Sequence, residues 1–243
     1  KQSMNGCAKK RFENYKQQPL EFVFDKSFTG KLSQFGLDPN RRTPSGIKAA
    51  IIREKGTNGE REMAYMLYLA GFDVKDVTMT DLISGRETLE DINMVVYCGG
   101  FSNSDVLGSA KGWAGSFLFN PKAKAALDNF YAREDTLSLG VCNGCQLMLG
   151  LITPEDKKKG KMLHNDSHKF ESNFLGVTVP MNRSVMFGSL SGSKLGIWVA
   201  HGEGKFSLPY PEDHYNVVLK YSYDEYPGNP NGSDYSVAGI ASQ

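Results

Sequence analysis

The sequence lacks a long apolar run, a strong excess of charge of one sign and a complete zinc-binding set of cysteines and histidines. Its 243 residues carry a formal net charge of +1, which gives no electrostatic basis for binding nucleic acid or an anionic membrane. No apolar run approaches the roughly 20 residues of a membrane-spanning helix. The basic N-terminus is not followed by the apolar core of a secretory signal. We therefore expect no nucleic-acid partner and no membrane association.

Cysteines are few, and only two of them lie close together. The four are Cys7, Cys98, Cys142 and Cys145, and the last two have C-x-x-C spacing. That spacing suits a redox pair or half of a zinc site, but no second C-x-x-C or histidine pair completes such a site. We therefore expect no metal, interpret the pair as a nucleophile with a buried neighbour, and predict a reducing, cytoplasmic location.

Residues 136–150, TLSLGVCNGCQLMLG, predict a strand, a sharp turn at Cys142 and the start of a helix. The amides and dipole at a helix start favour thiolate over thiol, and Gly140 and Gly144 permit a tight bend. A buried structural role is the commoner fate of a free cysteine. The Gly-x-Cys-x-Gly-x-Gln context, which ends at Gln146, instead favours a nucleophile, as in the Gly-x-Ser-x-Gly elbow.

Strand-like and helical patterns alternate through the first part of the chain. The predicted strands span residues 47–52, 72–79, 91–98 and 136–141. The predicted helices span residues 60–70, 121–131 and the segment after Cys142. This alternation predicts an α/β fold, an open, mostly parallel sheet with helices on both faces. Ligands of such sheets bind beyond the carboxyl ends of the strands, where Gly99-Gly100 and Cys142 both lie.

The two ends of the chain follow other patterns. Residues 1–45 read as an extension, in which 20–25 (LEFVFD) form either a strand or a surface tail. The charged run 156–161 predicts a loop. Short β-like segments after it predict antiparallel additions in the C-terminal half, at 174–179, 197–200, 215–223 and 237–241.

Nucleophilic catalysis by Cys142 also requires oxyanion donors and a base. Backbone amides near Gly100 and Asn143 are candidate donors, since a glycine pair lets the backbone approach a ligand closely. His201 is a candidate base with Glu203 as its orienting carboxylate. The same Ala-His-Gly-Glu-Gly loop is equally consistent with lining a cleft without proton transfer.

Several motifs together resemble one family. They are GVCNGCQ, CGGFSNSDVLGSAKGWA, WVAHGEGKF and YPGNPNGS. They are similar to the glutaminase domain of the large, single-chain phosphoribosylformylglycinamidine synthases, which are class I (triad) glutamine amidotransferases. The resemblance covers about residues 47–243 and implies a flavodoxin-like glutaminase domain over 46–243. Residues 1–45 resemble the end of the synthetase portion and its connector.

The resemblance implies that Cys142 attacks glutamine to form a thioester and release ammonia. The ammonia then passes to a synthetase domain of the same enzyme, a ligase of purine biosynthesis. There formylglycinamide ribonucleotide becomes the amidine at the expense of ATP. ATP and Mg are implied for the whole enzyme, and no cofactor for this segment. We expect five residues to line the glutamine site: Gly99, Gly100, Phe101, Asn143 and Gln146.

One departure from the family concerns the base. The family's catalytic His and Glu lie in a Pro-His-Pro-Glu-Arg stretch a little beyond the segment that matches VAGIASQ, whereas this sequence ends at Gln243. The resemblance therefore implies that the triad His and Glu would follow Gln243, disfavours His201 and Glu203 as catalytic residues, and implies an inactive fragment truncated at its C-terminus. Two alternatives stay open: a self-contained cysteine amidohydrolase that uses Cys142, His201 and Glu203, and a non-catalytic docking module.

Overall fold

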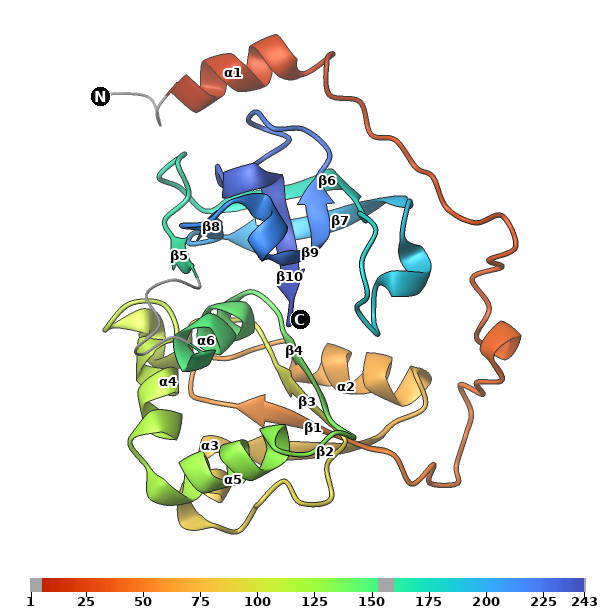
Figure 1. Ribbon diagram of the computed structural model, residues 1–243, viewed down its shortest axis with the longest axis vertical. Helices are drawn as coiled ribbons and strands as arrows, with labels where there is room; N and C mark the ends of the chain where they lie inside the picture. Colours follow the sequence, from red (N-terminus) through yellow and green to blue (C-terminus); the bar gives the residue numbers. More distant parts are fainter. Residues whose placement is uncertain (1–5, 153–159, 243) are drawn as a thin grey trace. The chain divides into compact units, whose positions relative to one another are not determined.

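A computed structural model describes residues 6–152 and 160–242 (Figure 1). The chain divides into two compact units, one of residues 29–155 and one of residues 1–28 with 156–243. Each unit has its own sheet. The boundary expected near residue 45 from the resemblance stays a prediction. No helix among the described residues has the length and apolar character needed to cross a membrane.

The unit of residues 29–155 contains a four-stranded sheet in the order β2-β1-β3-β4, with every neighbouring pair parallel. Its strands are β1 (Lys48–Arg53), β2 (Asp73–Thr78), β3 (Met94–Tyr97) and β4 (Leu137–Gly140). Its helices are α2 (Glu60–Leu69), α3 (Met79–Ser84), α4 (Lys111–Leu118), α5 (Pro121–Tyr131) and α6 (Asn143–Ile152). Two 3₁₀ turns are η2 (Leu32–Phe35) and η3 (Ser102–Asp105). The predicted open parallel sheet is confirmed, in the flavodoxin-like strand order.

Both faces of this sheet are covered, because successive residues of a strand point to opposite sides. Ile51 shares one core cluster with Leu67 of α2. Its neighbour Ile52 shares the opposite cluster with Trp113 of α4 and Leu147 of α6. Full burial of one such side chain contributes about 1.5–3 kcal/mol. The two clusters fix the helices on either side of the sheet, as the sequence predicted.

The second predicted strand ends one residue early. The strand β2 stops at Thr78, and α3 begins at Met79. Thr78 accepts a hydrogen bond from the Asp81 amide, while the Asp81 carboxylate accepts one from the Thr78 amide at 2.9 Å. This capping box satisfies helix-start amides and overrides the strand-like alternation. Hydrogen bonds from Thr78 lower the pKa of Asp81 to about 2.

The other unit contains an antiparallel sheet in the order β10-β9-β6-β7. Its strands are β6 (Glu171–Thr178), β7 (Lys194–His201), β9 (Asn216–Tyr221) and β10 (Val237–Ala241), and β5 (Lys161–Leu163) pairs with β8 (Lys205–Ser207). It also holds α1 (Cys7–Asn14) and the 3₁₀ turns η4 (Gly188–Leu190), η5 (Glu212–His214) and η6 (Asp234–Ser236). The predicted antiparallel additions are confirmed. The predicted loop at 156–161 lies largely outside the described residues.

The described residues 6–28 of the N-terminal extension belong to this antiparallel unit and are held in it by polar contacts. The segment 20–25 is not a full strand: only Val23 pairs, in an isolated bridge to Lys194. The helix α1, which the sequence did not predict, is anchored by Arg11. Its guanidinium donates to the Tyr226 hydroxyl at 2.7 Å and pairs with the buried Glu171. For residues 20–25, the surface-tail interpretation is therefore better than the strand interpretation.

Candidate active site

Cys142 occupies a sharp turn between a strand and a helix. The strand β4 ends at Gly140, and α6 begins at Asn143. Cys142 has a φ of 55°, a left-handed conformation that is strained for a residue with a side chain. Such strain persists only where the surroundings hold it, and it is concentrated at active sites. The predicted strand, elbow and helix are confirmed.

Gly140 and Gly144 let α6 pack directly against the sheet. A Cβ on Gly140 would lie 2.5 Å from the carbonyl oxygen of Gly144. A Cβ on Gly144 would lie 2.0 Å from the carbonyl oxygen of Tyr97. Both distances are far below van der Waals contact, so only glycine fits. The sequence indicated a tight bend, and the structure adds that these glycines serve close approach.

The loop after β3 forms a second wall beside the elbow. Gly100 has a φ of 118°, and a Cβ there would lie 2.5 Å from the carbonyl oxygen of Gly56. The Phe101 amide donates to the same carbonyl at 2.8 Å, and Gly100 forms an isolated bridge with Thr57. The loops after β1 and β3 are thus joined at the carboxyl ends of adjacent parallel strands, where such sheets bind ligands. The Phe101 side chain is 55% exposed.

The backbone amides of Gly100 and Asn143 hydrogen-bond the sulfur of Cys142. The two predicted oxyanion donors therefore meet at the predicted nucleophile. Burial is the largest influence on this thiol and raises its pKa, while the two amides lower it. The amide at the helix start thus favours thiolate, in the direction predicted, but burial outweighs it, so the pKa of the thiol is raised overall.

Burial shifts the pKa of two other cysteines more strongly. Burial raises the pKa of Cys98 to about 11 and that of Cys145 to about 12. All four cysteines are free thiols. Within residues 6–152 and 160–242, no group of three or more His, Cys, Asp or Glu side chains is arranged to hold a metal ion. Within the part of the chain that the structure describes, two backbone amides donate to the sulfur of Cys142.

A polar network that the sequence did not predict surrounds Asn143. Its side chain is fully buried and bonds the Ser102 amide, the Asp105 carboxylate and the Gln146 side chain. The side chain of Gln146, which we expected to bind glutamine, thus accepts a hydrogen bond from Asn143. The one signal in the sequence was Ser-Asn-Ser-Asp, residue types that tolerate the left-handed turn found at 103–105.

His201 and Glu203 belong to the antiparallel unit, at and just beyond the end of β7. Nδ1 of His201 is buried and has no hydrogen-bond partner among the residues that the structure describes, and burial lowers the pKa of the imidazole. Glu203 forms an ion pair with Nδ1 of His164 at 3.2 Å. The described residues include no ion pair between His201 and Glu203, so the contact that orients a base is not formed. The role of His201 as a base stays a prediction.

The triad His and Glu that the resemblance implies would follow Gln243, the last residue of the sequence. The described part of the chain ends one residue earlier, at Ser242, so Gln243 itself lies outside the described residues. The strand β10, which leads toward this end, closes at Ala241. The expectation that the catalytic His and Glu come after Gln243 therefore stays a prediction.

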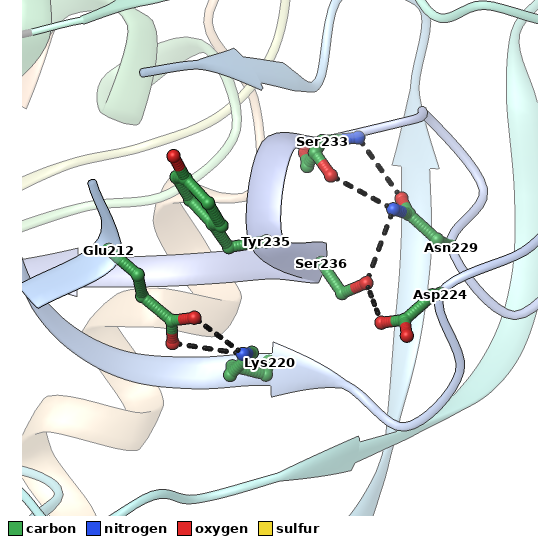
Figure 2. Close-up of a pocket in the computed structure, with 7 residues that line it drawn as sticks. All are labelled: Glu212, Lys220, Asp224, Asn229, Ser233, Tyr235 and Ser236. Carbon is green, nitrogen blue, oxygen red and sulfur yellow. Dashed lines mark hydrogen bonds and ion pairs between the residues drawn. The ribbon is translucent and has the colours of Figure 1, made fainter. Parts of the chain in front are cut away.

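The antiparallel unit has a polar cavity of about 430 Å³ (Figure 2). It is lined by Glu212, Lys220, Asp224, Asn229, Ser233, Tyr235 and Ser236. Figure 2 shows that each of these residues except Tyr235 bonds another member of the set. Lys220 pairs with Glu212 at 2.9 Å, and the Ser236 hydroxyl donates to Asp224 at 2.6 Å. We assign this network to holding the turn before β10, not to chemistry.

Comparisons with known proteins identify relatives over most of the chain. Residues 46–243 match the family described as the CobB/CobQ-like glutamine amidotransferase domain. Phosphoribosylformylglycinamidine synthase of Drosophila melanogaster is 41% identical over 221 residues, which cover 83% of this chain and 16% of that protein. The probable chloroplastic/mitochondrial phosphoribosylformylglycinamidine synthase of Arabidopsis thaliana is 44% identical over 215 residues, 80% of this chain and 15% of that protein.

A solved structure agrees in fold. The structure of PurLQS from Thermotoga maritima matches with a TM-score of 0.62 at 27% sequence identity. The match covers 80% of this chain and 81% of that one. By contrast, the chain spans only 15–16% of the length of the two relatives above.

Proposed function

This chain belongs to the CobB/CobQ-like glutamine amidotransferase domain family, and from that premise we propose that it is the glutamine-hydrolysing part of a phosphoribosylformylglycinamidine synthase. The observation that carries the proposal is the convergence of the Gly100 and Asn143 amides on the sulfur of Cys142. A nucleophile with two main-chain donors at the carboxyl edge of a parallel sheet is suited to acyl transfer.

The reaction follows from this geometry. The sulfur of Cys142 attacks the side-chain amide carbon of glutamine, and the amide oxygen becomes an oxyanion between the amides of Gly100 and Asn143. Collapse of this intermediate breaks the carbon–nitrogen bond, so that ammonia leaves with one added proton and a thioester remains. Water then attacks the thioester and releases glutamate and the free thiol. Preorganised donors of this kind are worth about 10²–10³ in rate each.

A base must accept the thiol proton, because burial keeps Cys142 protonated near neutral pH. Among the described residues, the buried Nδ1 of His201 has no hydrogen-bond partner and therefore no orienting carboxylate. We therefore propose that another group is the base, as the family resemblance implies. The self-contained amidohydrolase that uses His201 and Glu203 is the less favoured function.

The remaining steps belong to the whole enzyme. We propose that the ammonia is delivered to a synthetase domain, where ATP with Mg²⁺ activates the amide oxygen of formylglycinamide ribonucleotide. The four free thiols suit a reducing compartment, and we propose the cytoplasm.

The test is to measure glutamine hydrolysis by the full-length protein that contains this chain. We expect wild-type protein to release glutamate and ammonia from glutamine in equal amounts, and Cys142→Ala to abolish release while Cys145→Ala retains most of it. Equal release by Cys142→Ala and wild type would refute the proposal. A wild-type protein that neither bound nor hydrolysed glutamine would favour the docking-module alternative.

A further inference from the structure

The side chain of Asn143 joins the two strained segments of the site. It is 0% exposed. Its Oδ1 accepts the Ser102 amide at 3.1 Å, and its Nδ2 donates to the Asp105 carboxylate at 3.3 Å and to Gln146 Oε1 at 2.9 Å. Its backbone amide meanwhile donates to Cys142. One residue thus bonds the nucleophile through its main chain and the opposite loop through its side chain.

The opposite loop requires such support. Asn103, Ser104 and Asp105 have φ values of 52°, 55° and 50°, three consecutive left-handed residues that carry side chains. Conformations of this kind persist only where surrounding contacts enforce them. Asp105 also accepts the Ala110 amide at 3.2 Å, so its carboxylate closes the turn. The same loop carries Gly100, the other donor to the sulfur.

The Ser102 amide and the Asp105 carboxylate together set the direction of this network. A carboxamide can turn over and exchange its oxygen and nitrogen. Asn143 must present oxygen to the Ser102 amide, so its NH₂ must face acceptors. Gln146 can itself turn over and present NH₂, whereas an ionised carboxylate only accepts. Of the two side chains that accept from Asn143, Asp105 is therefore the one that cannot be inverted.

We propose that Asp105 is a positioning residue, whose carboxylate orients the Asn143 amide and thereby sets the spacing of the Gly100 and Asn143 main-chain donors. The inference rests on the proposed glutaminase function. The charge of Asp105 itself acts against the nucleophile, since it raises the pKa of Cys142. Its contribution is therefore geometric, and a neutral acceptor at the same place should replace it.

The first test compares three variants of the full-length protein in glutamine hydrolysis. Asp105→Ala removes the acceptor, and we expect kcat to fall about ten- to a hundredfold with KM within about twofold, since misplaced donors act on the transition state. Asp105→Asn keeps an oxygen that the Ala110 amide directs, and we expect kcat within about threefold of wild type. Asp128→Ala, which removes an equal charge from the exposed Lys124 pair on α5, should match wild type.

Asp105→Asn decides the case even if Asp105→Ala folds poorly, because it preserves size and shape. A fall of about tenfold or more in the kcat of Asp105→Asn would overturn the orientation role and assign the effect to charge. Wild-type kcat in Asp105→Ala would overturn it as well.

A second test does not depend on glutamine turnover. Iodoacetamide alkylates a thiolate, with a carbon–sulfur bond formed and iodide released, and mass spectrometry of the Cys142 peptide follows the rate against pH. Both substitutions remove the charge of Asp105, which lowers the midpoint, the pH at which the alkylation rate of Cys142 is half-maximal. Only Asp105→Ala also displaces the two amides that stabilise the thiolate, which raises that pH again. We expect its midpoint to lie above that of Asp105→Asn by about half a pH unit or more. Coincident midpoints would refute the proposal, even in a protein that did not hydrolyse glutamine.

Discussion

Gly144, the first glycine of α6, packs against the main chain of Tyr97 on β3 with no room for a side chain. A Cβ at Gly144 would lie 2.0 Å from the Tyr97 carbonyl oxygen. The helix that follows Cys142 is therefore seated directly on the strand that leads to Gly100. This contact fixes the distance between the two loops that supply hydrogen bonds to the sulfur.

Gly144→Ala should lower the free energy of unfolding by about 1–3 kcal/mol, the usual cost of overpacking. The gain in helix propensity from glycine to alanine, about 1 kcal/mol, is too small to offset a clash with backbone. Gly150→Ala in the same helix is the control, since its Cβ would lie at an ordinary 3.4 Å from Ala114 Cβ. Urea unfolding curves measure both variants, and equal midpoints would contradict the close contact.

Alkylation should select Cys142 over its neighbours. The sulfur of Cys142 accepts two amide hydrogen bonds, whereas burial raises the pKa of Cys98 to about 11 and that of Cys145 to about 12. We expect iodoacetamide at pH 8 to modify Cys142 at least tenfold faster than either, because the thiolate is the nucleophile. Peptide mass spectrometry over time gives the order, and earlier modification of Cys145 would reverse the assignment of nucleophile.

His201→Ala should reduce glutamine hydrolysis less than tenfold. Loss of a general base costs about 10²–10⁴ in rate, but His201 makes no ion pair with Glu203 among the described residues, and Glu203 pairs with His164. The measurement is kcat for glutamate release by the full-length protein. A loss in the range of a missing base would restore His201 as the catalytic histidine.

Asp73→Asn should destabilise the unit of residues 29–155 and weaken its response to acid. Hydrogen bonds from Arg41, with the amides of Ser45 and Gly46, lower the pKa of Asp73 to about 2. Because the folded pKa lies below the unfolded one, this contribution is present above about pH 4 and is lost as the pH falls through about 2. For Asp73→Asn we expect a lower free energy of unfolding at pH 7. We also expect that free energy to fall less steeply than in the wild type between pH 4 and pH 2.

Asp128→Asn provides the matched control for this prediction, since its exposed pair with Lys124 contributes little. In Asp73→Asn the dependence of the unfolding free energy on pH should become weaker without vanishing, because Asp81 has a pKa of about 2 as well. Unfolding curves at several pH values measure the effect. An unchanged slope in Asp73→Asn would show that the Arg41 contact does not stabilise the fold.

Local sequence determined the elements that carry the nucleophile. Alternation at 136–141, Asn143-Gly144 and the apolar spacing after them predicted strand, elbow and helix, since each depends on short-range backbone preference. The sequence also contains the Thr78 and Asp81 of the capping box, but the strand-like alternation through Met79 led to the prediction of a strand there. The unpredicted α1 gained its support from Glu171 and Tyr226, which are remote in the chain.

The chemistry of the site depended on contacts between distant segments. The sequence by itself determined that Cys142 sits between a strand and a helix, and it selected Gly100 and Asn143 as candidate donors. Only the tertiary structure decided that burial outweighs the amide hydrogen bonds and raises the pKa of Cys142, and that Asp105 accepts a hydrogen bond from Asn143. The physical reason is that backbone preference acts over a few residues, whereas desolvation and hydrogen-bond direction depend on the complete surroundings of an atom.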